Sequence, residues 1–322
     1  MAPRTPLRSC VVFGGAHLSF SGHSHRRCLF LQPFFKSHPP LRALGQFMRF
    51  LKFYWSAETK FTVHSPFVFD FLVNVLEDRR PFYAYGQVEA LRRSLLEDRS
   101  ELELEELGAG SKVSRKRRRT VRRLVETSCV SPEWGRFLFR LVHHYKPRTL
   151  LELGTCLGVS TLYQASAAPD STIVTVEGQE ELARRAEQVL QRLPHERLHI
   201  LTGTFDERMD QALHILRRLD YLYVDGNHRY DATLRYFERA LNYAHEHSVF
   251  VFDDIHWSAQ MERAWKDICR HPRVRLSLDL FRMGVVFFRP EIKVKTHFNL
   301  VPWYWKPWKM GFLSAAGSTP PA

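Results

Sequence analysis

The stretch RTLLELGTCLGVSTL, residues 148–162, decides the fold. Its apolar first half predicts a buried strand, and the helix that follows is predicted to open near Ser160. Gly154 allows the sharp turn between them, and Gly158 allows the backbone to run close to a ligand. Ser160 or Thr161 can cap the helix, whose first amide groups would then face the ligand with a partial positive charge. Such corners bind nucleotide-like ligands in open parallel sheets.

A second apolar strand, residues 172–176, follows this corner and ends on Glu177. The separation from Glu152 to Glu177 is that of one strand–helix–strand unit. An acid at the tip of the second strand can hold a ribose diol through two hydrogen bonds. Two plainer interpretations stay open: a purely structural glycine turn, and an exposed acid that only flanks a helix.

The order of the motifs, Glu-x-Gly-x-x-x-Gly-x-Ser followed by Val-x-Glu-Gly, differs from the G-x-G-x-x-G pattern. It resembles the class I S-adenosylmethionine-dependent methyltransferases, above all O-methyltransferase-like members, including a bacterial group with a similar N-terminal extension. The resemblance covers residues 53–300. It implies S-adenosyl-L-methionine as the cofactor and in-line methylation of an oxygen of a small-molecule acceptor.

The resemblance also implies a place for each cofactor-binding residue. The loop after the first strand would surround the methionine part, Glu177 would bind the ribose, and the end of the third strand would border the adenine. The residues so assigned are Glu152, Gly154, Thr155, Gly158, Ser160, Glu177, Thr204, Phe205 and Asp225.

From residue 148 onward, strand and helix patterns alternate, which predicts a parallel sheet with right-handed crossovers. A C-terminal pair of strands joined by a short turn predicts a hairpin. We therefore predict an α/β, Rossmann-like, mostly parallel seven-stranded sheet with a C-terminal antiparallel hairpin, helices on both faces and an N-terminal helical extension. The predicted strands are 149–153, 172–177, 198–202, 220–225, 248–253, 274–278 and 284–288, and the predicted helices lie near 160–167, 180–192, 206–218, 230–246 and 258–270.

Three acids, Asp225, Asp253 and Asp254, follow neighbouring strands of this sheet. Their charges would repel one another unless a cation or a protonation change relieved them. Metal-dependent O-methyltransferases of the resembling group place acids at similar strand ends, so we expect a Mg²⁺ site at these three residues. The match is partial, because an Asp-Asn pair is often seen where this chain has Asp253-Asp254, and Asp254 can equally cap the next turn.

Two histidines follow the same acids, and His228 and His256 are candidate general bases. The alternative for each is a histidine that only packs and hydrogen-bonds in its loop. We predict Asp225, His228 and Asp253 as the catalytic residues. Methyl transfer from a sulfonium depends mainly on placing the acceptor in line, so the site can be chemically sparse.

The net charge of +13 is concentrated in two places. Residues 1–57 contain no Asp or Glu, and residues 112–123 form a basic run. The rest of the chain carries slightly more acidic than basic residues. The basic run lacks interleaved aromatics, so we expect a solvated helix or loop, with an RNA-facing patch as the alternative. The five scattered cysteines argue for a reducing compartment and a cytoplasmic protein. No segment reaches the ~18 apolar residues of a membrane span.

Four segments are expected along the chain. Residues 1–47 read as an unstructured or non-native leader, with a targeting segment as the alternative. Residues 48–145 form a helical extension that packs on the sheet, covers the substrate or forms a homodimer surface; a helix lying on a membrane stays open. Residues 146–300 form the methyltransferase-like domain, and residues 301–322 form an aromatic tail.

Three functions remain in competition. The first is the methyltransferase on a small-molecule acceptor, the second a non-methylating, metal-dependent, hydroxylase-like relative on the same scaffold, and the third a binding or scaffold module acting through residues 112–123. The glycine sequence LGAGS at 107–111 imitates a cofactor loop, but it follows an acidic segment and not a buried strand. We expect it to play no part in cofactor binding, and we expect no nucleic-acid partner.

Overall fold

The computed structural model describes residues 40–106, 115–193 and 195–309. The chain divides into two compact units, Met1–Met48 and Arg49–Ala322. Most of the predicted leader, the glycine-rich 107–111 and the end of the tail thus lie outside the described residues.

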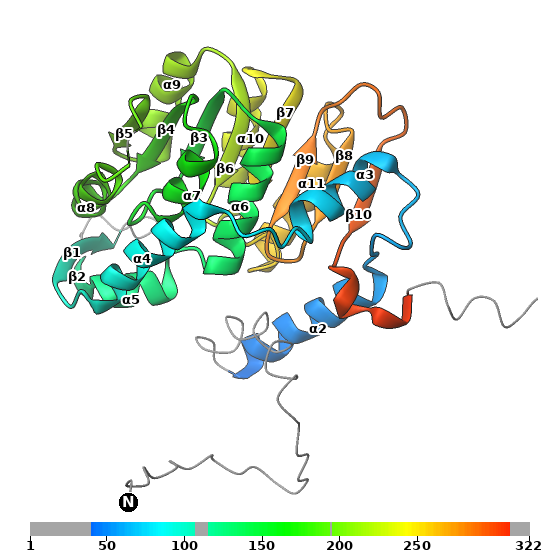
Figure 1. Ribbon diagram of the computed structural model, residues 1–322, viewed down its shortest axis with the longest axis horizontal. Coiled ribbons are helices and arrows are strands. Elements are labelled where there is room, and N and C mark those ends of the chain that lie inside the picture. Colours follow the sequence, from blue (N-terminus) through cyan, green and yellow to red (C-terminus); the bar gives the residue numbers. More distant parts are fainter. Residues whose placement is uncertain (1–39, 107–114, 194, 310–322) are drawn as a thin grey trace, which may run out of the picture. The chain divides into compact units, whose positions relative to one another are not determined.

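The larger unit is built on an eight-stranded sheet with the order β10-β8-β9-β7-β6-β3-β4-β5 (Figure 1). Strands β3 to β7 pair in parallel, and β9 runs antiparallel to both β7 and β8. The mostly parallel α/β fold and its C-terminal hairpin are confirmed. The strands are β3 (Thr149–Leu153), β4 (Thr172–Glu177), β5 (Leu198–Thr202), β6 (Leu219–Val224), β7 (Ala244–Phe252), β8 (Leu276–Asp279), β9 (Gly284–Phe287) and β10 (Thr296–Asn299).

Helices lie on both faces of this sheet (Figure 1). Helices α6 and α7 pack on each other, and α10 packs on both α9 and α11. This double cover explains why β3, β4 and β6 are apolar runs and not alternating patterns, because nearly all of their residues are buried. The helices are α6 (Pro132–Tyr145), α7 (Val159–Ala167), α8 (Glu180–Leu190), α9 (Phe205–Leu216), α10 (Tyr230–Leu241) and α11 (Ala259–Arg270).

The prediction of seven strands was wrong by one, because β10 adds an eighth at the edge of the sheet. It pairs in parallel with β8, where the Thr296 amide donates to the Arg275 carbonyl at 3.0 Å and the Leu300 amide to the Asp279 carbonyl at 2.8 Å. The strand is four residues long and shows no alternation of buried and exposed positions. Its backbone pairing therefore leaves no hydrophobic pattern in the sequence.

Residues 115–120 of the basic run form a strand, so the expectation of a solvated helix or loop was wrong for them, whereas Arg122 and Arg123 lie exposed on helix α5 (Val121–Thr127). Strand β2 (Arg115–Thr120) pairs antiparallel with the acidic strand β1 (Glu101–Glu106), so basic residues lie opposite acids or leucines along the hairpin. Arg118 approaches Glu101 at 3.8 Å and Glu103 at 3.7 Å. Opposite charges across a strand pair favour this register. Neither segment shows the pattern alone, because the complementarity lies in the pair.

The N-terminal extension is mainly helical, as expected, although its limits differ. Helix α2 (Pro40–Ser56) begins at Pro40 and not at Met48. Ser65 caps α3 by accepting a hydrogen bond from the Val68 amide, with Pro66 at the first turn, as the sequence predicted. No described helix is long and apolar enough to cross a membrane. The remaining elements are α3 (Pro66–Phe71), η1 (Leu72–Leu76), α4 (Tyr83–Glu97), α5 (Val121–Thr127), η2 (Trp303–Trp305) and η3 (Pro307–Lys309).

Candidate functional site

The loop between β3 and α7 turns at a glycine that no other residue can replace without strain. Gly154 has φ +111°, and its amide donates to the Val176 carbonyl at 3.0 Å. A Cβ at this position would lie 2.0 Å from the carbonyl oxygen of Asp225. The loop therefore runs directly against the end of β6, which confirms the sharp turn expected at Gly154.

Gly158 closes the same loop and is the N-cap of α7, with φ +77°. A Cβ here would lie 3.1 Å from Leu190 of α8, so the glycine also permits close packing beneath the loop. No side chain caps α7, and the prediction of a Ser160 or Thr161 cap was wrong. The amides of the first turn have no acceptor within the helix, which leaves a positively polarised end at the sheet edge.

Glu152 lies beneath the loop and holds the sequence-predicted residues together. Its buried carboxylate accepts hydrogen bonds from the Thr175 hydroxyl at 2.8 Å, the Gln164 amide at 2.9 Å and the Thr161 hydroxyl. Burial raises the pKa of Glu152, and the donors around the carboxylate oppose that effect. Thr155 joins the same network through the Thr175 hydroxyl at 2.6 Å. These hydrogen bonds use the Glu152 carboxylate to connect β3 with α7 and β4 beneath the loop.

Glu177, at the tip of β4, borders the loop from the other side. One carboxylate oxygen accepts from the Cys156 amide at 2.8 Å and the other from the Gln179 amide at 2.9 Å. Burial raises the pKa of Glu177, while these backbone amides favour its charged form. Each oxygen has a second lone pair, which is the acceptor capacity that two ribose hydroxyls require.

The third strand end supplies a helix start and an aromatic ring. Thr204 caps α9 in a capping box with Glu207, so its side chain is engaged with the helix. Phe205 packs edge-on to Tyr236, with ring centroids 5.6 Å apart. A Cβ on Gly226 would lie 2.8 Å from the Phe205 ring, so this glycine brings the ring against the loop after β6. The ring therefore lies between Tyr236 of α10 and the loop after β6.

The acids after β6 and β7 do lie together, but an arginine and not a metal ion compensates their charge. Asp253 is fully buried and accepts two hydrogen bonds of 3.0 Å from the guanidinium of Arg282. The Tyr223 hydroxyl lies 3.1 Å from both Asp253 and Asp225, so it links the two carboxylates. The Asp254 amide donates to Asp253 at 2.8 Å.

These contacts do not fit the predicted Mg²⁺ site, and that prediction is corrected. The part of the chain that the structure describes contains no group of three or more His, Cys, Asp or Glu side chains able to hold a metal ion. Arg282 takes both oxygens of Asp253 and supplies the cation that three crowded acids need. Burial, followed by repulsion from Asp253 and Asp254, raises the pKa of Asp225 well above its usual range.

The two histidines have different environments. The ring of His256 binds Asp279 at 2.8 Å and Glu262 at 3.0 Å, one carboxylate on each nitrogen. Burial alone would lower the pKa of His256, but the two carboxylates overcome it and raise the pKa to about 9. The ring is therefore a buried imidazolium with no nitrogen left to accept a proton, and it does not suit a general base.

His228 remains as the candidate base. Its Nε2 lies 3.8 Å from Asp254 and 4.0 Å from Asp225, and its side chain is 30% exposed. Partial exposure leaves room for an acceptor hydroxyl beside the ring.

Backbone strain gathers at the same edge of the sheet. Cys156, Asn227 and Asp254 have positive φ angles of 49°, 49° and 53°, and each follows a different strand of the parallel core. Left-handed conformations of residues other than glycine persist where the surrounding structure holds them in place, and they cluster at binding sites. Three such residues follow neighbouring strands at this edge, whereas Lys146 and Arg217 also have positive φ angles ahead of β3 and β6.

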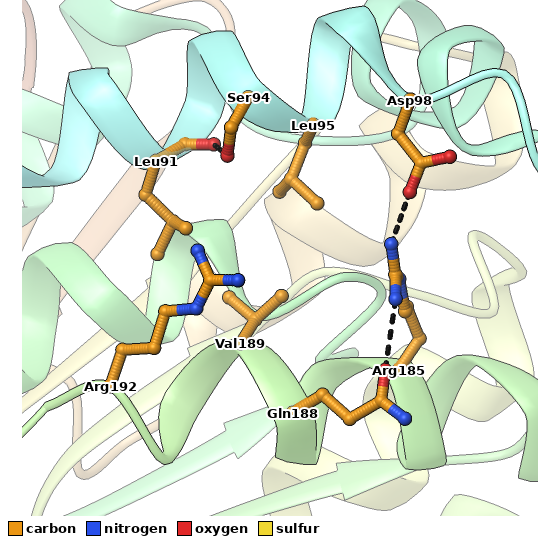
Figure 2. Close-up of a pocket in the computed structure, with 8 residues that line it drawn as sticks. All are labelled: Leu91, Ser94, Leu95, Asp98, Arg185, Gln188, Val189 and Arg192. Atoms are coloured by element: carbon orange, nitrogen blue, oxygen red, sulfur yellow. Dashed lines mark hydrogen bonds and ion pairs between the residues drawn. The ribbon is translucent and has the colours of Figure 1, made fainter.

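A pocket of about 230 Å³ lies elsewhere, between α4 and α8 (Figure 2). Arg185 crosses it and is bound to Asp98 and, at 2.9 Å, to Gln188. Arg185 and Asp98 are thus partnered across the helix pair, and none of the sequence-predicted site residues lines the pocket. The lining residues are Leu91, Ser94, Leu95, Asp98, Arg185, Gln188, Val189 and Arg192.

Part of the chain is similar in sequence to known proteins. Residues 151–255 match the family model described as a methyltransferase domain. Over 108 residues the chain is 34% identical to the "Transmembrane O-methyltransferase homolog" of Mus musculus. This alignment covers 32% of this chain and 42% of that relative. The chain thus spans less than half the length of this curated relative.

Solved structures of O-methyltransferases are also similar to this chain, at lower sequence identity. The enzyme from Bacillus cereus, in complex with SAH, is 20% identical with a TM-score of 0.46, covering 65% of this chain and 92% of that one. TomG from Streptomyces achromogenes, in complex with SAM, is 17% identical with a TM-score of 0.48, covering 69% and 95%. The family match agrees with the methyltransferase resemblance that the motifs predicted, over residues 151–255.

Proposed function

We propose that the protein is an S-adenosylmethionine-dependent methyltransferase acting on an oxygen of a small-molecule acceptor. The observation that carries the proposal is the pairing of Glu177 with the Gly154–Gly158 loop. The buried Glu177 carboxylate accepts a hydrogen bond of 2.8 Å from the Cys156 amide of this loop. The loop lies within the segment that matches a methyltransferase domain.

The residues present fit this cofactor. Glu177 would accept from the ribose hydroxyls, and the first amides of α7 would meet the methionine carboxylate. Thr204 and Phe205 would border the adenine, beside Gly226. The bound cofactor supplies a methyl group on a positively charged sulfur, from which the group leaves readily. Glu152 acts indirectly in this proposal, by fixing the loop from below.

The chain itself would place the acceptor in line with the methyl group and remove one proton from that acceptor. His228 would accept the proton of the acceptor hydroxyl, and its Nε2 lies 3.8 Å from Asp254 and 4.0 Å from Asp225. Asp225 and Asp253 would hold the wall of the site through Tyr223 and Arg282. In-line placement contributes most, with an effect worth up to about 7–11 kcal/mol.

The competing functions find less support in the geometry. A metal-dependent hydroxylase-like reaction needs a cation site, and Arg282 already takes both oxygens of Asp253. A binding module acting through the basic run would need its charges free for a partner, whereas Arg115, Lys116 and Arg118 of β2 lie opposite acids of β1.

Calorimetric titration with S-adenosylhomocysteine tests the proposal. We expect a Kd at or below the micromolar level, about −8 kcal/mol, for the unmodified chain. Glu177→Gln should weaken binding at least tenfold, because the amide donates where the ribose needs an acceptor. Glu180→Gln, at an exposed position three residues along, is the matched control and should bind like the unmodified chain. No binding, or equal binding by Glu177→Gln, would contradict the proposal.

A further inference from the structure

Two cysteines meet at the loop that the proposed function assigns to the cofactor. The sulfur atoms of Cys129 and Cys156 lie 3.8 Å apart, and both residues are partly exposed free thiols. Cys156 belongs to the Gly154–Gly158 loop, whereas Cys129 follows the end of α5. The two positions are far apart in the sequence and lack the C-x-x-C spacing of a redox motif, so only the fold reveals the pair.

The two thiols differ in a way that suits stepwise oxidation. A hydrogen bond from the Cys156 thiol lowers the pKa of Cys129, against the effect of burial. The same contact, with burial and the nearby Glu177 charge, raises the pKa of Cys156. Cys129 is thus the better nucleophile, and a resolving thiol already lies beside it.

We propose that Cys129 and Cys156 form a reversible disulfide, driven by hydroperoxides, that controls the conformation of the Gly154–Gly158 loop. The Cys129 thiolate attacks the terminal peroxide oxygen, its sulfur becomes a sulfenic acid, and the O–O bond breaks; the leaving oxygen takes up the proton released by the thiol and departs as water from hydrogen peroxide, or as an alcohol from an organic hydroperoxide. Cys156 then attacks that sulfur, an S–S bond forms, and the S–O bond breaks to release water. The two thiols lose two electrons, and the peroxide gains them.

Bond formation must bring the two sulfur atoms closer together. A disulfide holds its sulfur atoms about 2.05 Å apart, so they must approach from 3.8 Å. Cys129 is anchored at the end of α5, where its amide donates to the Leu124 carbonyl at 3.1 Å. Gly154 is held against the Asp225 carbonyl. The change therefore falls on Cys156, whose amide also donates to Glu177.

Oxidation should therefore separate the Cys156 amide from Glu177 and weaken ligand binding. We expect at least a tenfold loss of S-adenosylhomocysteine affinity, which corresponds to about 1.4 kcal/mol. Coupling is reciprocal, so saturating S-adenosylhomocysteine should in turn slow the oxidation of the pair. This link to affinity rests on the proposed function, but formation of the disulfide does not.

The experiment oxidises the reduced full-length chain with hydrogen peroxide and maps disulfides by mass spectrometry without reduction. Calorimetry with S-adenosylhomocysteine and amide hydrogen exchange of residues 155–158 follow on the same samples. We expect a Cys129–Cys156 crosslink, a tenfold weaker affinity and altered exchange, all reversed by dithiothreitol. Cys129→Ser should abolish the three responses, and Cys269→Ser, at a partly buried cysteine of α11, should keep them.

The outcomes separate this inference from the proposed function. Absence of the crosslink, while other cysteines oxidise, overturns the inference. So does a crosslink that leaves both affinity and exchange unchanged. If the reduced chain does not bind S-adenosylhomocysteine, the proposed function fails, and the crosslink with altered exchange at residues 155–158 still supports control of the loop.

Discussion

Replacing Arg282 by glutamine should expose how much of the site depends on its guanidinium. The arginine donates two hydrogen bonds of 3.0 Å to Asp253, whose side chain is 0% exposed. Removing one partner of a buried, bidentate pair leaves a charge without compensation and typically costs about 3–5 kcal/mol. The neighbouring acids Asp225 and Asp254 add to that repulsion, so we expect the upper part of this range for Arg282→Gln.

Urea denaturation at neutral pH measures this loss. Arg184→Gln is the matched control, because Arg184 pairs with Glu181 at an exposed position where such a change costs less than about 1 kcal/mol. The double variant Arg282→Gln/Asp253→Asn should recover most of the lost stability, since it removes the unpaired charge. A loss below about 1 kcal/mol for Arg282→Gln, equal to that of the control, would refute the view that Arg282 compensates these acids.

Three further changes probe the rest of the molecule. Gly154→Ala should lose at least about 2 kcal/mol of stability and most S-adenosylhomocysteine affinity, since its Cβ would lie 2.0 Å from a carbonyl oxygen. The control Gly86→Ala, with open space around it, should gain about 0.5–1 kcal/mol of stability, and equal stabilities and affinities for the two variants would contradict this prediction. The pKa of His256 in the folded protein, about 9, lies above its unfolded value near 6.5, so its contribution of up to about 3 kcal/mol to the free energy of unfolding should be present below pH 6.5 and disappear as pH rises through 9. If the free energy of unfolding of His256→Gln changes with pH as that of the unmodified chain does, this contribution is excluded. EDTA should leave the melting temperature and S-adenosylhomocysteine affinity unchanged, because Arg282 occupies Asp253, and a drop in either would restore a metal site.

The sequence predicts well what local chemistry determines. Strands β3, β4 and β5 begin and end where predicted, because each is a short apolar run bounded by glycine, proline or charged residues. Gly154 was assigned its turn correctly, since only glycine fits a φ of +111°. The edge that carries the acids also follows from sequence, because parallel strands place their carboxyl ends together.

What the sequence does not reveal depends on residues distant in the chain. Arg282 lies in the turn between β8 and β9 with no motif around it, and only the fold brings it to Asp253. His256 looked like a base until its two carboxylate partners were in place. The partnership of β1 with β2, and that of Cys129 with Cys156, are likewise properties of pairs. Motif reading thus locates the edge of the site but not what compensates its charges.

The most direct test of the central claim is a crystal structure of the chain grown with S-adenosylhomocysteine. The account predicts ribose hydroxyl oxygens within about 3 Å of both Glu177 carboxylate oxygens, with the ligand extending along the Gly154–Gly158 loop. Ligand density at another place, such as the pocket between α4 and α8, with Glu177 still bound only to backbone amides, would contradict it.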